Sequence, residues 1–151
     1  MKRRRWWVGA ILVLAAAAIL ATTTAAPARG DEMVVYKDPN CGCCENWIEH
    51  VESAGFEVAV RNRSSLADIK ERYGITAALM SCHTAVIDGY AVEGHVPADV
   101  IQRLLRERPA VTGIAVPGMP GGAPGMEGAI RERYNVLTFD RSGVTRIYAT
   151  R

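Results

Sequence analysis

The sequence predicts a mixed α/β fold that forms one domain. Short runs of β-prone residues alternate with stretches that carry apolar residues at helical spacing. Two pairs of β-prone runs are joined by short turn segments, which predicts two hairpins. The chain has 151 residues, which is room for a single domain of ordinary size.

The first 28 residues have the composition of a secretory signal peptide. Residues 1–5 are basic, residues 8–20 form an apolar run, and residues 26–28 give a small-x-small cleavage site, with residues 24–26 as a competing one. The apolar run is shorter than the roughly 20 residues that a membrane-spanning helix needs, although an uncleaved anchor stays an alternative. We therefore predict one domain over residues 29–151, located in the periplasm and free of the membrane after cleavage.

The basic character of the chain comes from this leader. The whole chain has 18 basic and 16 acidic residues, whereas residues 29–151 hold 14 basic and 16 acidic ones, a formal charge of −2. No nucleic-acid partner is expected from such a charge.

The predicted domain begins with a strand over residues 33–36 and a helix that follows the cysteines and runs to about Ala54. Gly55 supplies the residue that ends this helix. One apolar stripe runs along the helix, formed by Cys44, Trp47, Ile48 and Val51. This phase turns Cys44 toward the core. His50 lies off the stripe, and we expect it to be solvated and without a role.

Five further elements follow in the middle of the chain. Residues 56–60 alternate as a second strand, parallel to the first, and Ser65 to Asp68 resembles a capping box that opens a short helix ending at Gly74. Residues 83–94 form a hairpin around Asp88-Gly89. Pro97 opens a third helix that Pro109 stops. The order β-α-β-α-β-β-α is the thioredoxin-like arrangement.

A loop and a second hairpin complete the chain. Residues 116–128 contain five glycines and three prolines, which excludes helix and strand. Met119 and Met126 stand in this loop, and their thioethers are soft ligands suited to Cu(I). Residues 134–148 form a hairpin that extends or caps the sheet.

Three cysteines lie within four residues at the start of the first helix. Cys41 and Cys44 form a C-x-x-C pair, the spacing of redox motifs and of half a metal site. Cys43 lies between them, and a simple disulfide would not require this third thiol. The position favours thiolates, because the helix N-terminus stabilises negative charge. The cluster indicates that soft metal ligands are present.

A second group of donors precedes the predicted hairpin. In a thioredoxin-like fold, the loop before the third strand packs against the C-x-x-C motif, and here it carries Cys82 and His83. We therefore expect Cys82 and His83 to reach the three cysteines, although about 40 residues separate them. His95 follows the hairpin and is a further candidate ligand.

These motifs together resemble one known family. Residues 41–44, 81–85, 89–98 and 116–120 are similar to the CopG-type copper-resistance proteins, a periplasmic metal-binding family once described only as a domain of unknown function. The resemblance covers nearly all of residues 29–151. It implies a thioredoxin-like fold, export, and copper bound by cysteines with nearby histidine or methionine. The implied ligands are Cys41, Cys43, Cys44, Cys82, His83, His95, Met119 and Met126.

The sequence favours a copper-binding protein over an enzyme. Four thiols exceed the needs of one Cu(I) ion, so bridging sulfurs, several coppers and redox cycling of the metal are expected alternatives. Copper ions and other periplasmic copper-handling proteins are the expected partners. The main alternative is a thiol–disulfide oxidoreductase that uses Cys41 for attack and Cys44 for resolution. A structural zinc site of the Cys₃His type is a third reading.

Overall fold

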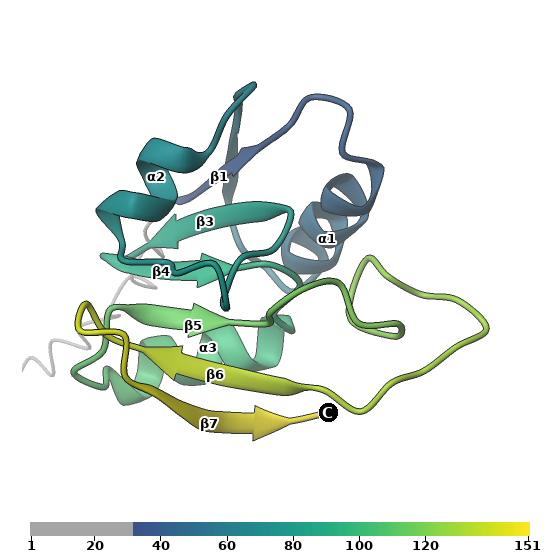
Figure 1. Cartoon of the computed structure of the whole chain (residues 1–151). Helices are drawn as coiled ribbons and strands as arrows, with labels where there is room; N and C mark the ends of the chain where they lie inside the picture. The colour runs from purple at the N-terminus through teal and green to yellow at the C-terminus, as the bar shows by residue number, and fades with distance from the viewer. Residues whose placement is uncertain (1–31) are drawn as a thin grey trace, which may run out of the picture.

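The computed structural model describes residues 32–151, which form one mixed sheet with three helices (Figure 1). The elements in chain order are β1 (Met33–Lys37), α1 (Gly42–Ser53), β2 (Val58–Asn62), α2 (Ala67–Arg72), β3 (His83–Ile87), β4 (Tyr90–Glu93), α3 (Ala98–Glu107), β5 (Gly113–Ala115), β6 (Asn135–Phe139) and β7 (Thr145–Thr150). The predicted signal peptide lies outside the described residues.

The seven strands pair in the order β2-β1-β3-β4-β5-β6-β7. β1 runs parallel to β2 and antiparallel to β3, and β4 runs parallel to β5. Both hairpins are antiparallel, and the β6–β7 hairpin extends the sheet at its far edge. The register of the β1–β3 pair sets Lys37 opposite His83, so the end of β1 lies beside the start of β3.

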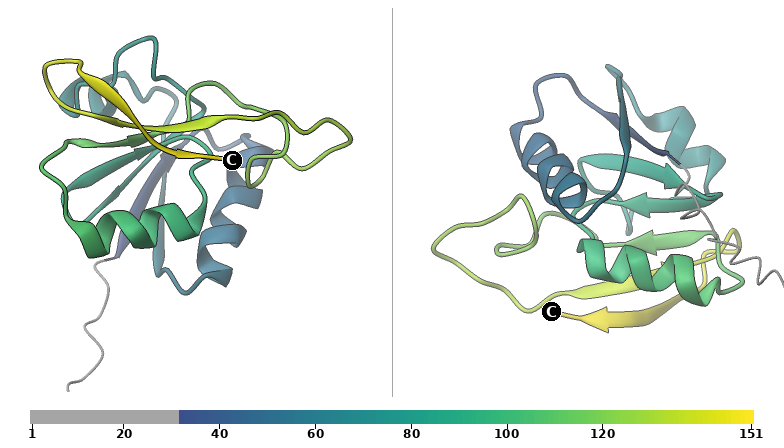
Figure 2. Two further views of the ribbon diagram at one scale, coloured as in Figure 1. Left: turned by 90° about the horizontal axis from the view of Figure 1, so that it is seen from below. Right: turned by 180° about the vertical axis from the view of Figure 1, so that it is seen from behind.

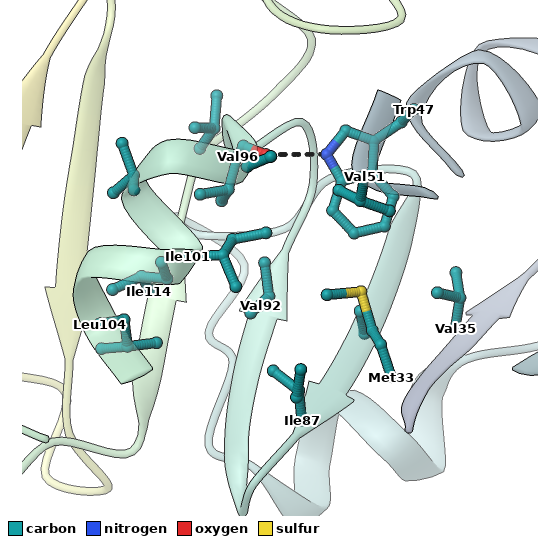
Figure 3. Close-up of a cluster of buried hydrophobic side chains, with 14 of the residues drawn as sticks. Met33, Val35, Trp47, Val51, Ile87, Val92, Val96, Ile101, Leu104 and Ile114 are labelled. Atoms are coloured by element: carbon teal, nitrogen blue, oxygen red, sulfur yellow. Dashed lines mark hydrogen bonds between the residues drawn. The ribbon is translucent and has the colours of Figure 1, made fainter. Parts of the chain in front are cut away.

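Helices α1 and α3 cover one face of the sheet and α2 lies on the other (Figure 2). The larger apolar core fills the space between the sheet and helices α1 and α3. Trp47 of α1 is fully buried there, and its indole N–H donates to the carbonyl of Val96 over 2.9 Å (Figure 3). Within residues 32–151, no helix has the length and apolar character needed to cross a membrane.

The α/β class and the predicted element order are confirmed, and both hairpins and the helix end at Gly55 form where expected. The thioredoxin-like arrangement stays an interpretation of this order. The capping box is wrong in detail, because Leu66 is the N-cap residue of α2 and makes no side-chain capping bond, while Ser65 only accepts a bond from the Ala67 amide. Strand β5 was not predicted; it is too short to produce a periodic pattern.

The segment between β5 and β6 contains no helix or strand, as its glycines and prolines predict. It packs against the first turns of α1. A Cβ atom on Gly125 would lie 2.7 Å from the carbonyl oxygen of Cys43 and 2.8 Å from the amide nitrogen of Trp47. Gly125 also has a φ of +81°, a conformation that side chains disfavour. Glycine is therefore required for the loop to contact α1.

We predict that Gly125→Ala destabilises the protein by at least about 2 kcal/mol, because it combines left-handed backbone strain with a backbone clash. Urea unfolding followed by tryptophan fluorescence measures this change.

Gly128→Ala is the matched control in the same loop. A Cβ atom there meets nothing within 4 Å, so we expect a change within about 1 kcal/mol in either direction. Equal stabilities for the two variants would contradict the close packing of the loop on α1.

Candidate metal centre

The three clustered cysteines sit where β1 turns into α1. Two hydrogen bonds to Asp38 fix the turn, since the Asn40 amide donates to its carboxylate over 2.8 Å and the Cys41 amide donates to its carbonyl over 3.1 Å. Cys41 is the N-cap residue of α1. The sulfurs of these three residues therefore lie at the N-terminus of α1.

Cys82 joins this cluster from the loop before β3, as the sequence predicted. Its Sγ lies 3.9 Å from Cys43 Sγ, which in turn lies 3.6 Å from Cys41 Sγ. The four sulfurs, here called the sulfur cluster (Cys41, Cys43, Cys44 and Cys82), all lie within 4.8 Å of one another. Donor atoms at this spacing can share one metal ion or bridge several.

Cys82 also belongs to a second donor set, the Cys-His group (Cys82, His83 and His95). The distance from Cys82 Sγ to His95 Nε2 is 3.0 Å. On its other side, the His95 ring places Nδ1 2.8 Å from the carbonyl oxygen of Pro124. A carbonyl only accepts, so we assign the ring proton to Nδ1, and Nε2 offers its lone pair toward Cys82. A partner that fixes the tautomer in this way is typical of metal-binding histidines.

His83 is fully buried beneath the cluster. Its Nδ1 lies 3.4 Å from Cys82 Sγ, and its ring contacts Trp47 at 4.3 Å and His95 at 5.1 Å between ring centroids. In the described part of the chain, His83 Nε2 has no hydrogen-bond partner. The packing of the two rings therefore orients the nitrogen that faces Cys82.

The electrostatics of the site keep both imidazoles neutral. Burial lowers the pKa of His83 well below its ordinary value, and the neighbouring His95 and the charges of Lys70 and Lys37 lower it further. Burial also lowers the pKa of His95, against smaller raising effects from Pro124 and Glu127. Neutral imidazole is the form that binds metal.

Cys82 behaves differently from a reactive cysteine. Burial, and to a smaller extent the neighbouring Cys43, raises the pKa of the Cys82 thiol to about 12. The metal-free site therefore holds a protonated sulfur that donates toward His95. A metal ion that binds both atoms takes the place of this proton, so binding releases a proton.

The structure contains a disulfide between Cys41 and Cys44, while Cys43 and Cys82 carry free thiols. The sequence predicts all four cysteines as metal ligands, whereas a disulfide between Cys41 and Cys44 belongs to the alternatives, a simple disulfide or a thiol–disulfide oxidoreductase. In the disulfide form, Cys43, Cys82 and the two histidines are the donors that can bind a metal ion. Reduction adds two thiols to the same cluster.

Met119 and Met126 lie on the loop that follows β5. The Met119 side chain is 54% exposed, whereas Met126 is half-buried and its amide donates to the Ala123 carbonyl over 2.8 Å. Ligation by these two thioethers stays a prediction.

Three residues near the site were missed by sequence reasoning. Lys70 and Glu93 form a buried ion pair behind the Cys82 loop. The sequence signal for this pair was Glu93, a charged residue in an otherwise apolar strand. His50 was wrongly expected to be solvated. It is half-buried, and its Nε2 accepts the Ala98 amide over 3.1 Å at the start of α3.

Comparisons with known proteins identify the family of the chain. A family model described as "Protein of unknown function, DUF411" matches residues 79–126, which include Cys82, His83 and His95. No curated protein matches the chain. Two solved structures, titled "Copper resistance protein copG" Form 1 and Form 2, share 46% sequence identity with it at a TM-score of 0.76. Each alignment covers 81% of this chain and 98% of the other. The chain therefore belongs to the CopG family of copper resistance proteins.

Proposed function

We propose that the chain binds Cu(I) through the sulfur cluster and the Cys-His group and acts in copper resistance. The observation that carries this proposal is the position of Cys82, whose sulfur lies 3.9 Å from Cys43 Sγ and 3.0 Å from His95 Nε2. Thiolate and imidazole together form a donor set that suits Cu(I). The names of the two solved relatives support copper as the metal.

The number of copper ions follows from the state of the cysteines. One Cu(I) ion takes two or three ligands, whereas the four cysteine sulfurs lie within 4.8 Å of one another and two imidazoles are nearby. Reduction of the Cys41–Cys44 disulfide makes all four sulfurs available as thiolates. Sulfurs this close support bridging between several coppers. Imidazole accepts both oxidation states of copper, so His83 and His95 also support interconversion of Cu(I) and Cu(II).

We further propose that the protein works in the periplasm, where it exchanges copper with other copper-handling proteins. The basic and apolar pattern of the first 28 residues supports export. The disulfide between Cys41 and Cys44 suits an oxidising compartment.

A thiol–disulfide oxidoreductase is the second candidate, and the same disulfide favours it. Cys41 is partly exposed and Cys44 is fully buried, which is the arrangement of an attacking and a resolving thiol. An oxidoreductase function would give no role to Cys43, to Cys82 or to His95, whose ring is oriented by Pro124. The copper proposal uses all of these donors.

We predict that the reduced protein binds more than one Cu(I) ion per chain, and that the protein with an intact Cys41–Cys44 disulfide binds at most one. The disulfide removes two of the four thiolates from the site. Anaerobic titration against a chromogenic Cu(I) chelator measures both values. Equal stoichiometry in the two states would show that these two sulfurs are not ligands.

Cys82→Ser separates the two candidate functions. We expect this variant to bind less Cu(I), because the sulfur cluster and the Cys-His group share that sulfur. A dithiol oxidoreductase would keep most of its activity in insulin reduction, since Cys41 and Cys44 are intact. Cys41→Ser is the control and abolishes any such reductase activity. Robust reduction by metal-free wild type, together with unchanged copper binding by Cys82→Ser, would favour the enzyme.

The two loop methionines can be tested against a third methionine whose exposure is close to that of Met119. Met119→Leu and Met126→Leu are expected to weaken Cu(I) binding on the order of tenfold if each thioether is a ligand. Met80→Leu is the control, because Met80 is 45% exposed and was not predicted to bind metal. Affinities within twofold of wild type for all three variants would remove the methionines from the ligand set.

A further inference from the structure

A buried ion pair lies directly behind the Cys82 loop. Lys70 of α2 bonds to Glu93 of β4, and the side-chain exposures are 9% and 0%. Neither residue belongs to the sulfur cluster or the Cys-His group. Burial raises the pKa of Glu93, while the charge of Lys70 lowers it. The pair is therefore held inside the protein on the α2 side of the sheet.

The pair bonds to both residues that flank Cys82 and His83. Before the two donors, the Ser81 amide donates to Glu93 Oε1 over 2.6 Å, and the Ser81 carbonyl accepts from Lys70 Nζ over 3.2 Å. After them, the Thr84 hydroxyl donates to Glu93 Oε2 over 2.6 Å and accepts from Lys70 Nζ over 3.2 Å. The Cys82-His83 dipeptide is thus fixed at its two ends by one ion pair.

The same carboxylate also connects this dipeptide to His95. Glu93 stands two residues before His95 in the chain, and Gly94 between them approaches Ser81 closely. A Cβ atom on Gly94 would lie 2.5 Å from Ser81 Cβ, and the Gly94 amide donates to the His83 carbonyl over 3.0 Å. Glu93 therefore contacts the backbone segment that carries Cys82 and His83, and it belongs to the segment that carries His95.

Stability alone does not account for this pair. A buried ion pair is often no more stabilising than apolar residues of the same volume, because both charges lose their hydration. Its bonds here converge on the backbone and side chain next to the donors. Charge-assisted bonds of this kind orient the groups that they contact.

We propose that Lys70 and Glu93 are positioning residues that set the geometry of Cys82 and His83 for metal binding. The inference rests on the proposed Cu(I) function, and it adds two residues that touch no metal. The pair acts through Ser81 and Thr84, holding the Cys82 sulfur within reach of Cys43 and His95.

The test compares two double variants, in protein purified after expression of the full chain. Lys70→Met/Glu93→Leu removes the pair without leaving a buried charge unpaired. Lys70→Met/Glu93→Gln keeps an oxygen that can accept the Ser81 amide. We expect the first variant to lose about 10- to 100-fold in Cu(I) affinity, as outer-shell changes do at metal sites, and the second to recover part of this loss.

A matched control uses the ion pair between Arg63 and Asp68, which involves the same helix but is exposed. Arg63→Met/Asp68→Asn is expected to bind Cu(I) like wild type. Thermal unfolding of the metal-free proteins reports whether each variant keeps a cooperative fold. Wild-type affinity in both Lys70/Glu93 variants would overturn the proposal. So would loss of cooperative folding in both, because the pair would then be a folding determinant.

A measurement without metal separates this inference from the copper proposal. The alkylation rate of Cys82 relative to Cys43, followed by peptide mass spectrometry, reports how the loop holds the thiol. We expect the rate to rise at least tenfold in Lys70→Met/Glu93→Leu and to stay unchanged in the control. Failure of wild type to bind Cu(I) would defeat the proposed function alone, whereas an unchanged Cys82 rate would defeat the positioning role.

Discussion

The antiparallel pairing of β1 with β3 is the constraint on which the site depends. This pairing places Lys37, the last residue of β1, opposite His83, the first residue of β3. The segment that leaves β1 carries three cysteines, and the segment that enters β3 carries the fourth. A shift of one residue in this register would exchange the two faces of the strand. His83 would then leave its contact with Trp47, and the donors would separate.

The region around this pairing is unusual for a protein interior, because it buries several charged or ionisable side chains beside the apolar ones. Lys37, Lys70, His83, Glu93 and His95 are all buried, close to an apolar core. Each buried charge or imidazole requires a partner, since the loss of hydration is otherwise uncompensated. The ion pair of Lys70 with Glu93 and the bond of His95 to Pro124 meet this requirement. Apart from His83 Nε2, which has no hydrogen-bond partner within residues 32–151, these buried polar groups are bonded in a way that favours a single arrangement.

Much of this arrangement could be predicted from the sequence, because it depends on local patterns. The apolar stripe of α1, the Asp88-Gly89 turn and the glycine at position 55 each have a periodic or conformational signature, and the element order placed Cys82 beside Cys43. Other features depend on long-range contacts that leave little local signal. The bond from Ala98 to His50 joins residues 48 positions apart, and no spacing rule indicates it. Whether Cys41 and Cys44 are joined depends on redox state as well as on sequence.

The bond between His95 and Pro124 has a consequence for how the site is made. The cysteines and both histidines occur in the chain before residue 96, but the carbonyl that orients His95 belongs to a loop between β5 and β6. During synthesis, every cysteine and histidine donor therefore emerges from the ribosome before the loop that selects the tautomer of one of them. The geometry of the candidate site therefore depends on residues 116–134 folding back onto α1, and not on the segments that carry the cysteines and histidines alone.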